Sequence, residues 1–106
     1  MIFESELKNG RFVVPECPKC QKLVWPPSES CPRCFGNVVW RTADEPGMLV
    51  EYSAKDGRLF CMVEFENSIR VMGALECDTA PVDGQKVKVL KCGFDGSPKF
   101  TFGLEK

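Results

Sequence analysis

Four of the seven cysteines form two Cys-x-x-Cys pairs, and these are the residues of the sequence best suited to chemistry. Cys17 and Cys20 make the first pair, Cys31 and Cys34 the second, with ten residues between the pairs. Two cysteines three positions apart can direct both sulfurs at one ion from a tight turn, and a proline inside each pair pre-sets a backbone torsion of that turn. Because zinc favours four thiolates in a tetrahedron, the pattern predicts one Zn²⁺ per chain, held by these four cysteines.

A metal site made of four protein thiolates has no open coordination position for water or substrate. We therefore interpret the predicted zinc as structural, an ion that folds its module and does no chemistry. A rubredoxin-like iron centre uses the same ligand set and stays open as an alternative. A thioredoxin-like redox pair fits less well, because no strand–helix pattern surrounds either cysteine pair.

The remaining cysteines, Cys61, Cys77 and Cys92, lie among apolar neighbours in strand-like sequence. A free thiol packs as a small hydrophobic side chain, so we interpret these three as core residues. A nucleophilic cysteine usually needs a base to form its thiolate, and the sequence has no histidine. With no phosphate loop and no open metal site either, we expect a protein that is not itself an enzyme.

The segments that must position the cysteine pairs read as short strands, and the predicted fold is mainly β. Around the pairs we expect strands at residues 11–14, 23–25 and 38–40, with residues 41–47 as a linker. Beyond the linker, runs rich in β-formers alternate with turn residues, and we predict no helix. These later strands are predicted at residues 48–53, 59–65, 69–75, 85–91 and 99–102. The sequence thus predicts a rubredoxin-like zinc ribbon at 1–45 and a five-stranded OB-fold barrel at 46–106.

Charge and hydropathy narrow the classes of partner. The net charge is −1, and neither predicted domain carries a basic excess: residues 1–45 hold six bases and six acids, residues 46–106 eight and nine. Nucleic-acid binders usually show such an excess, so a nucleic-acid partner is not favoured. We interpret Lys86, Lys88 and Lys91 as a solvated strand face, and the phenylalanines at 60, 65, 94, 100 and 102 as barrel core. No apolar run is long enough for a membrane span and the N-terminus does not resemble a secretion signal, so we expect a cytoplasmic protein without a membrane partner.

The order of these parts resembles the acyl-CoA-associated zinc-ribbon/OB-fold family, long known as a domain of unknown function. The resemblance covers residues 12–103 and rests on the order and spacing of five stretches. They are residues 23–27 (LVWPP), the second cysteine pair, and residues 45–53 (EPGMLVEYS), 69–75 (IRVMGAL) and 81–87 (PVDGQKV). The sequence departs from the family at Ser28, where many members have arginine, and at Gln21 and Phe35, where many have glycine.

This resemblance implies a non-catalytic accessory or scaffold protein of a thiolase-superfamily enzyme. Partners in the family include thiolase-like acetyltransferases, hydroxymethylglutaryl-CoA synthase, lipid-transfer-type thiolases and aldolases that act on acyl-CoA. The protein would hold enzymes together or complete a CoA-binding channel, with CoA bound only alongside the partner. The residues that carry over as a CoA or partner edge are Trp25, Pro26 and Pro27, surrounded by Lys19, Lys22 and Arg33. For Trp25, packing over the zinc site is an equally weighted alternative.

A single-stranded nucleic-acid-binding module stays open as the second function, since zinc ribbons and OB-folds both serve that purpose. The two functions differ in a measurable way. The accessory protein should copurify with an acyl-CoA enzyme, whereas the nucleic-acid module should bind single strands with strong salt dependence.

Overall fold

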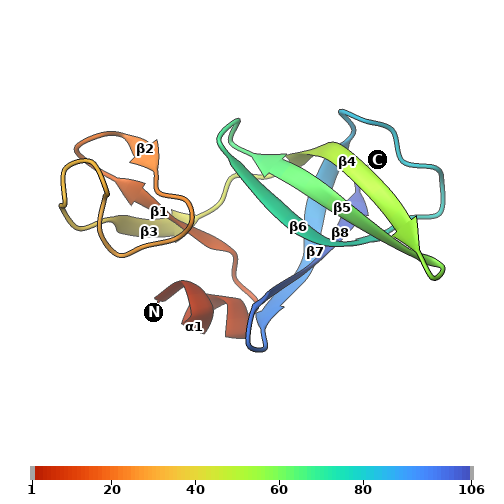
Figure 1. Cartoon of the computed structure of the whole chain (residues 1–106), viewed down its shortest axis with the longest axis horizontal. Helices are drawn as coiled ribbons and strands as arrows, with labels where there is room; N and C mark the ends of the chain where they lie inside the picture. The colour runs from red at the N-terminus through yellow and green to blue at the C-terminus, as the bar shows by residue number, and fades with distance from the viewer. Residues whose placement is uncertain (1, 106) are drawn as a thin grey trace.

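The computed structural model describes residues 2–105, which form one short helix and eight strands. The elements in chain order are α1 (Ile2–Lys8), β1 (Val13–Cys17), β2 (Lys22–Leu23), β3 (Val39–Thr42), β4 (Gly47–Lys55), β5 (Arg58–Phe65), β6 (Ile69–Glu76), β7 (Lys86–Phe94) and β8 (Pro98–Leu104). Figure 1 shows β1–β3 and β4–β8 as two bodies side by side, with α1 beneath the join. The mainly-β fold class predicted from the sequence is confirmed.

The first body is a small antiparallel sheet in the order β2-β1-β3, which we call the ribbon together with its two cysteine pairs. The central strand β1 ends at Cys17, whose backbone pairs with Lys22 of β2. On the other side, Val13–Glu16 pairs with β3 up to Thr42. The predicted strand at 38–40 therefore continues through Arg41 and Thr42, residues that the sequence suggested as linker, while Trp25 lies outside β2.

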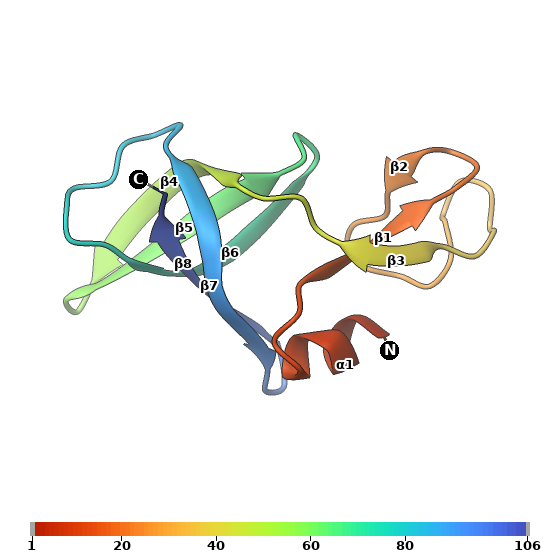
Figure 2. The same cartoon turned by 180° about the vertical axis from the view of Figure 1, so that it is seen from behind.

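The second body is a closed barrel in the order β4-β5-β6-β8-β7. The first three strands form a meander, and β8 inserts between β6 and β7, pairing parallel with β6. A short pairing of β4 with β7 at Gly47 and Met48 closes the circle. This strand order confirms the predicted five-stranded OB-type barrel, and Figure 2 shows it from behind.

Helix α1 is the element that the sequence analysis missed. Phe3 and Leu7, four residues apart, bury one face of it. Its C-terminus closes with a Schellman motif: the N–H of Arg11 donates to the carbonyl of Glu6 at 2.8 Å, and that of Gly10 to the carbonyl of Leu7 at 2.9 Å. Gly10 has a φ of 78°, which this motif requires. The helix has seven residues, too few to be stable alone, so its tertiary contacts hold it.

One continuous hydrophobic core joins the ribbon, the helix and the barrel. Phe12 reaches into the barrel, where its ring lies 5.1 Å from that of Phe65 and 5.0 Å from that of Phe100. At the other end, Phe3 of α1 packs against the two tryptophans of the ribbon. The predicted domain boundary at 45/46 lies in the connection between β3 and β4, and stays a prediction.

Of the eight residues predicted as core, four are buried, three are half-buried and one is exposed. Cys61 and the phenylalanines at 65, 100 and 102 are buried, and Cys77, Cys92 and Phe94 are half-buried. Phe60 is 40% exposed, contrary to the core position expected for it. Along β5 the buried residues alternate as Cys61, Val63 and Phe65, so Phe60 points outward. Within residues 2–105, no helix is long and apolar enough to cross a bilayer.

Candidate metal centre

The four predicted cysteine ligands come together at one end of the ribbon. Their Sγ atoms all lie within 4.8 Å of one another. The Sγ atoms of Cys17 and Cys34 are 3.5 Å apart, and those of Cys20 and Cys31 are 3.9 Å apart. A tetrahedron with Zn–S bonds of about 2.3 Å places its sulfurs about 3.8 Å apart, whereas a disulfide needs about 2.05 Å. The cluster therefore fits a tetrahedral zinc ion, and all seven cysteines are free.

Each Cys-x-x-Cys pair forms a knuckle, and in each knuckle a backbone N–H donates to the sulfur of the first cysteine. In the first knuckle, the backbone N–H of Cys20 donates to the sulfur of Cys17 at 3.4 Å. In the second, the backbone N–H of Arg33 donates to the sulfur of Cys31 at 3.4 Å. Hydrogen bonds from amides favour the thiolate form that a metal needs. Each turn thus positions the sulfur of its first cysteine with a backbone N–H.

The residue after each knuckle adopts a left-handed backbone conformation. Gln21 has a φ of 55° and Phe35 a φ of 61°. Their N–H groups donate to the carbonyls of Cys17 at 2.7 Å and of Cys31 at 2.8 Å, which closes each turn. Glycine adopts this region without a steric penalty, and a side chain with Cβ does not. The geometry explains why glycine is expected at these positions in the resembling family.

Without a metal the thiols of Cys31 and Cys20 would differ in acidity. Backbone N–H groups of Cys34 and Arg33 lower the pKa of the Cys31 thiol to about 6. Hydrogen bonds with the Cys17 and Cys31 thiols raise the pKa of Cys20 to about 12. Four thiolates this close repel one another, and a divalent cation among them would offset part of their charge. The arrangement is therefore suited to hold a metal ion with all four thiolates.

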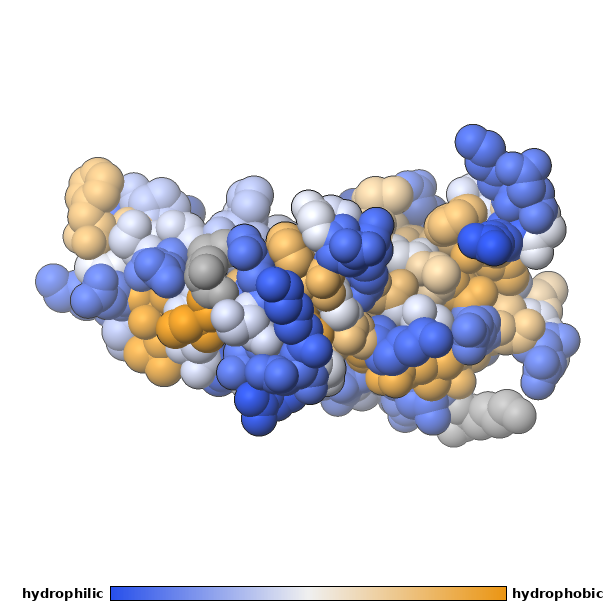
Figure 3. Space-filling model, turned by 90° about the horizontal axis from the view of Figure 1, so that it is seen from below, coloured by the Kyte–Doolittle hydropathy of each residue, from blue (hydrophilic) through white to orange (hydrophobic). Residues whose placement is uncertain are grey.

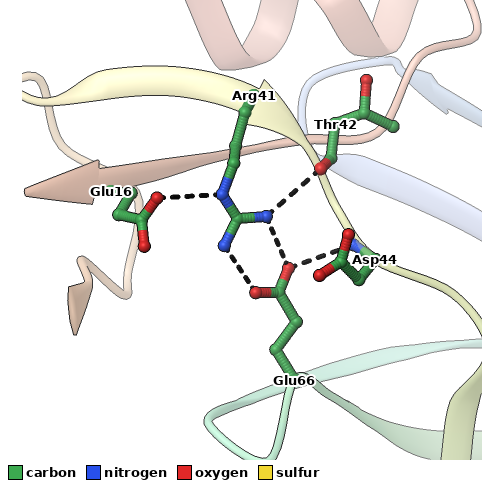
Figure 4. A network of polar contacts seen from close by, with 5 residues as sticks. All are labelled: Glu16, Arg41, Thr42, Asp44 and Glu66. Atoms are coloured by element: carbon green, nitrogen blue, oxygen red, sulfur yellow. Dashed lines mark hydrogen bonds and ion pairs between the residues drawn. The ribbon is translucent and has the colours of Figure 1, made fainter. Parts of the chain in front are cut away.

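An ionic cluster ties the ribbon to the barrel, and we call it the clamp (Figure 4). Arg41 of β3 donates from Nε to Glu16 of β1 at 3.0 Å and from Nη1 to Glu66 at 2.9 Å. Glu66 lies in the turn between β5 and β6 and also accepts the backbone N–H of Asp44 at 3.0 Å. The Arg41 hydrogen bonds hold the pKa of the Glu66 carboxyl below its ordinary value and raise the pKa of the guanidinium. No sequence motif pointed to this contact, because Arg41 and Glu66 lie on different bodies of the fold.

Two of the six predicted edge residues share a groove. Lys22 and Arg33 line an open groove of about 520 Å³ whose other walls include the clamp. Within the clamp, the positive charge of Arg41 is already paired with two carboxylates. Among the described residues that line this groove, Lys22 and Arg33 are the cations without a carboxylate partner. Lys19 is exposed and does not line the groove.

Trp25, the aromatic residue of the predicted edge, faces helix α1. The half-buried indole of Trp25 meets the Phe3 ring edge-on, with centroids 5.7 Å apart. Trp25 joins the main core and not the small apolar cluster around the zinc ligands, which contains Val24 and Val38. Pro26 is exposed and Pro27 is half-buried beside it. Lys22 and Arg33 thus line the same groove, whereas Trp25 packs against Phe3 of α1.

Comparison with known proteins supports the resemblance given by the sequence. Residues 5–39 match the family model for the rubredoxin-like zinc ribbon domain of ChsH2. No curated protein matches the sequence significantly.

Two solved structures share the fold of nearly the whole chain. One is described as an Ltp2-ChsH2(DUF35) aldolase, with a TM-score of 0.75, 20% identity, and coverage of 97% of this chain and 91% of that one. The other is a protein of unknown function of the DUF35 family from Sulfolobus solfataricus, with a TM-score of 0.67, 18% identity, and coverage of 94% and 81%. The predicted resemblance is confirmed by the ribbon match and by this common fold.

Proposed function

We propose that this protein is a non-catalytic accessory subunit of a thiolase-superfamily enzyme that acts on acyl-CoA thioesters in the cytoplasm. The observation that carries the proposal is the match in fold, over 97% of the chain, to a structure described as an Ltp2-ChsH2(DUF35) aldolase. A thiolase-like acetyltransferase, hydroxymethylglutaryl-CoA synthase or an aldolase of acyl-CoA substrates would fit as the partner. The free state of all seven cysteines is consistent with a reducing compartment.

The metal centre supports a structural role for the ribbon. Four thiolates complete the tetrahedron of a zinc ion, so a substrate would have to displace a protein ligand to reach the metal. The ion would hold together a part of the chain with few apolar residues of its own. Such a module presents a fixed surface to another protein.

The outer face of the barrel offers a surface for such a contact. Phe60, Met62 and Met72 lie side by side on it, since Met62 pairs directly with Met72 across β5 and β6. Met72 is 67% exposed, and with Tyr52 these side chains line a shallow groove of about 210 Å³. Methionine and aromatic side chains are typical of protein interfaces with a polar rim. We call this set the β5–β6 patch.

The groove beside the clamp supports the finer proposal that CoA is bound only in the complex. Lys22 and Arg33 supply two cations suited to phosphate groups. As the described residues form it, the groove is open to solvent on one side. An enzyme surface would therefore have to cover that side to enclose CoA. We therefore expect little CoA binding by the isolated protein and more after the enzyme has joined it.

Coexpression with candidate enzymes from the same cells tests the proposal. The tagged protein should copurify at a fixed ratio with a thiolase-superfamily enzyme, and Met72→Asp should abolish that copurification by placing a charge in the β5–β6 patch. Val82→Asp is the matched control, because Val82 is as exposed, at 64%, and lies outside the patch. If the protein copurifies with no such enzyme, the proposal is contradicted. Salt-dependent binding of a single-stranded oligonucleotide would instead support the nucleic-acid-binding function.

A further inference from the structure

Phe35 has the most exposed side chain among the large hydrophobic residues of the described chain, at 82%. It directly follows the last zinc ligand, Cys34, at the tip of the second knuckle. Hydrophobic atoms protrude at the ribbon end of the molecule in the space-filling view (Figure 3). An exposed phenylalanine by itself is common on protein surfaces, so its backbone conformation decides the argument.

The backbone conformation at position 35 is unfavourable for a phenylalanine and lowers the stability of the isolated protein. Its φ of 61° lies in the left-handed region, which is unfavourable for an aromatic residue and free of penalty for glycine. Gln21 occupies the equivalent position of the first knuckle with a φ of 55°, but it carries a polar side chain. The second knuckle alone therefore combines backbone strain with an unburied aromatic ring. Strain of this kind at a surface position often marks a functional site.

The second knuckle also holds Phe35 in a fixed position. Its N–H donates to the carbonyl of Cys31 at 2.8 Å, and the N–H of Cys31 donates to the carbonyl of Gly36 at 2.8 Å. An antiparallel β-bridge between Ser30 and Asn37 joins the two ends of the loop. A ring presented from so constrained a loop loses little conformational entropy when it enters a pocket.

The charges of the segment that carries the two knuckles indicate the chemistry of the partner surface. Residues 18–38 contain three bases, Lys19, Lys22 and Arg33, and a single acid, Glu29. Lys19 and Arg33 are exposed and lie in the two knuckles. An acidic rim on the partner would complement this end of the ribbon, although the whole chain has a net charge of −1.

We infer that Phe35 is an anchor residue that inserts into an apolar pocket with an acidic rim on the partner enzyme. The inference rests on the accessory function proposed above and adds a second contact, at the ribbon end, to that of the β5–β6 patch. It assigns a role to a residue that departs from the glycine expected at its position. The ring contributes nothing to folding and contributes to recognition.

Two glycine substitutions, Phe35→Gly and Gln21→Gly, test the anchor. Both should relieve backbone strain, so both should keep one zinc per chain and raise the melting temperature by a few degrees. Only Phe35→Gly should weaken binding to the purified partner enzyme, by about tenfold or more in Kd in a calorimetric titration. Because Phe35→Gly should raise the melting temperature and yet weaken binding, the loss of binding would not be due to a folding defect.

The outcomes distinguish the anchor from the accessory function. If wild type binds the enzyme and Phe35→Gly binds it with the same Kd, the accessory function stands and the anchor is overturned. If wild type binds none of the enzymes, the proposed function fails and the anchor fails with it. Charge complementarity has its own readout: Arg33→Glu should slow association and reduce its dependence on salt, with little change in the melting temperature.

Discussion

Arg41 and Glu66 form a two-pronged ion pair that joins the ribbon sheet to a turn of the barrel. Nη1 of Arg41 lies 2.9 Å from one carboxylate oxygen of Glu66, and Nη2 lies 2.5 Å from the other. The pair is half-buried, and Glu16 holds the guanidinium from the ribbon side. The two residues are 25 positions apart and lie on different bodies, so the contact links those bodies in addition to the shared hydrophobic core.

Glu66→Gln should destabilise the protein by about 1 kcal/mol, because the amide keeps the shape of the carboxylate but lacks its charge. Solvent access to Arg41 keeps the loss below that of a fully buried pair. Urea denaturation of the zinc-loaded protein measures it. Glu64→Gln is the control, since its partner Arg70 is largely exposed, and it should change stability by less than about 0.5 kcal/mol. If the two substitutions lower the free energy of unfolding equally, the Arg41–Glu66 pair contributes no more to stability than the exposed pair of Glu64 and Arg70.

The same carboxylate should make stability depend on pH in the acid range. Hydrogen bonds from Arg41 lower the pKa of Glu66 from its ordinary value of 4.5. A group with a depressed folded-state pKa contributes stability that is fully present above the unfolded value, and that is lost as pH falls through the folded value. The stability difference between wild type and Glu66→Gln should therefore be constant above about pH 5 and shrink below about pH 4. Urea titrations at equal zinc occupancy test this, and a difference that grows on acidification would refute it.

Zinc removal should unfold the ribbon before the barrel. The apolar cluster at the metal end holds only a few side chains, and the ion would supply most of its stability. Both tryptophans of the chain, Trp25 and Trp40, belong to the ribbon. Chelation and Cys17→Ser should therefore shift tryptophan emission to the red, while far-ultraviolet circular dichroism keeps its β signal. Cys92→Ser should bind one zinc and leave the emission unchanged, and a chelator-resistant spectrum would argue against the metal centre.

Phe3→Ala should test whether α1 holds the ribbon against the barrel. Its ring is 3% exposed and contacts Trp25 and Trp40 at centroid distances of 5.7 and 6.4 Å. Removing a buried phenylalanine costs about 3 kcal/mol or more. Ile2→Ala serves as the control, because Ile2 is 45% exposed on the same helix; its effect should stay within about 0.5 kcal/mol. The same small loss for both would show that the helix is dispensable.

Gly73→Ala should disrupt the barrel where β6 approaches β8. A Cβ at this position would lie 2.6 Å from the carbonyl oxygen of Phe100 and 2.7 Å from the Phe102 ring. Because the oxygen belongs to the backbone, the strands must separate, and we expect a loss of about 2 kcal/mol or more. Gly93→Ala meets no atom within 4 Å and should change the melting temperature little. A neutral Gly73→Ala would mean that the two strands can move apart freely.

The metal ligands and the strands of the barrel could be predicted because their signals are local. Two residues between cysteines fix where two sulfurs point, and the alternation of Val87 and Val89 with lysines marks the two faces of one strand. The same alternation would have placed Phe60 outside, since it is out of phase with Val63 and Phe65. Gly10 after Phe3 and Leu7 was a usable signal for α1, but too short a helix shows little periodicity.

By itself, then, the sequence determined the ligand set, the order of ribbon and barrel, and the number of barrel strands, all of which depend on neighbours along the chain. The tertiary structure alone decided that Arg41 meets Glu66, that Trp25 packs on Phe3, and that Phe35 stands exposed with a left-handed backbone. These relationships depend on how separately formed elements pack against one another. Contacts between residues far apart in the chain depend on burial and on backbone geometry. Neither can be read from the order of residues along the chain.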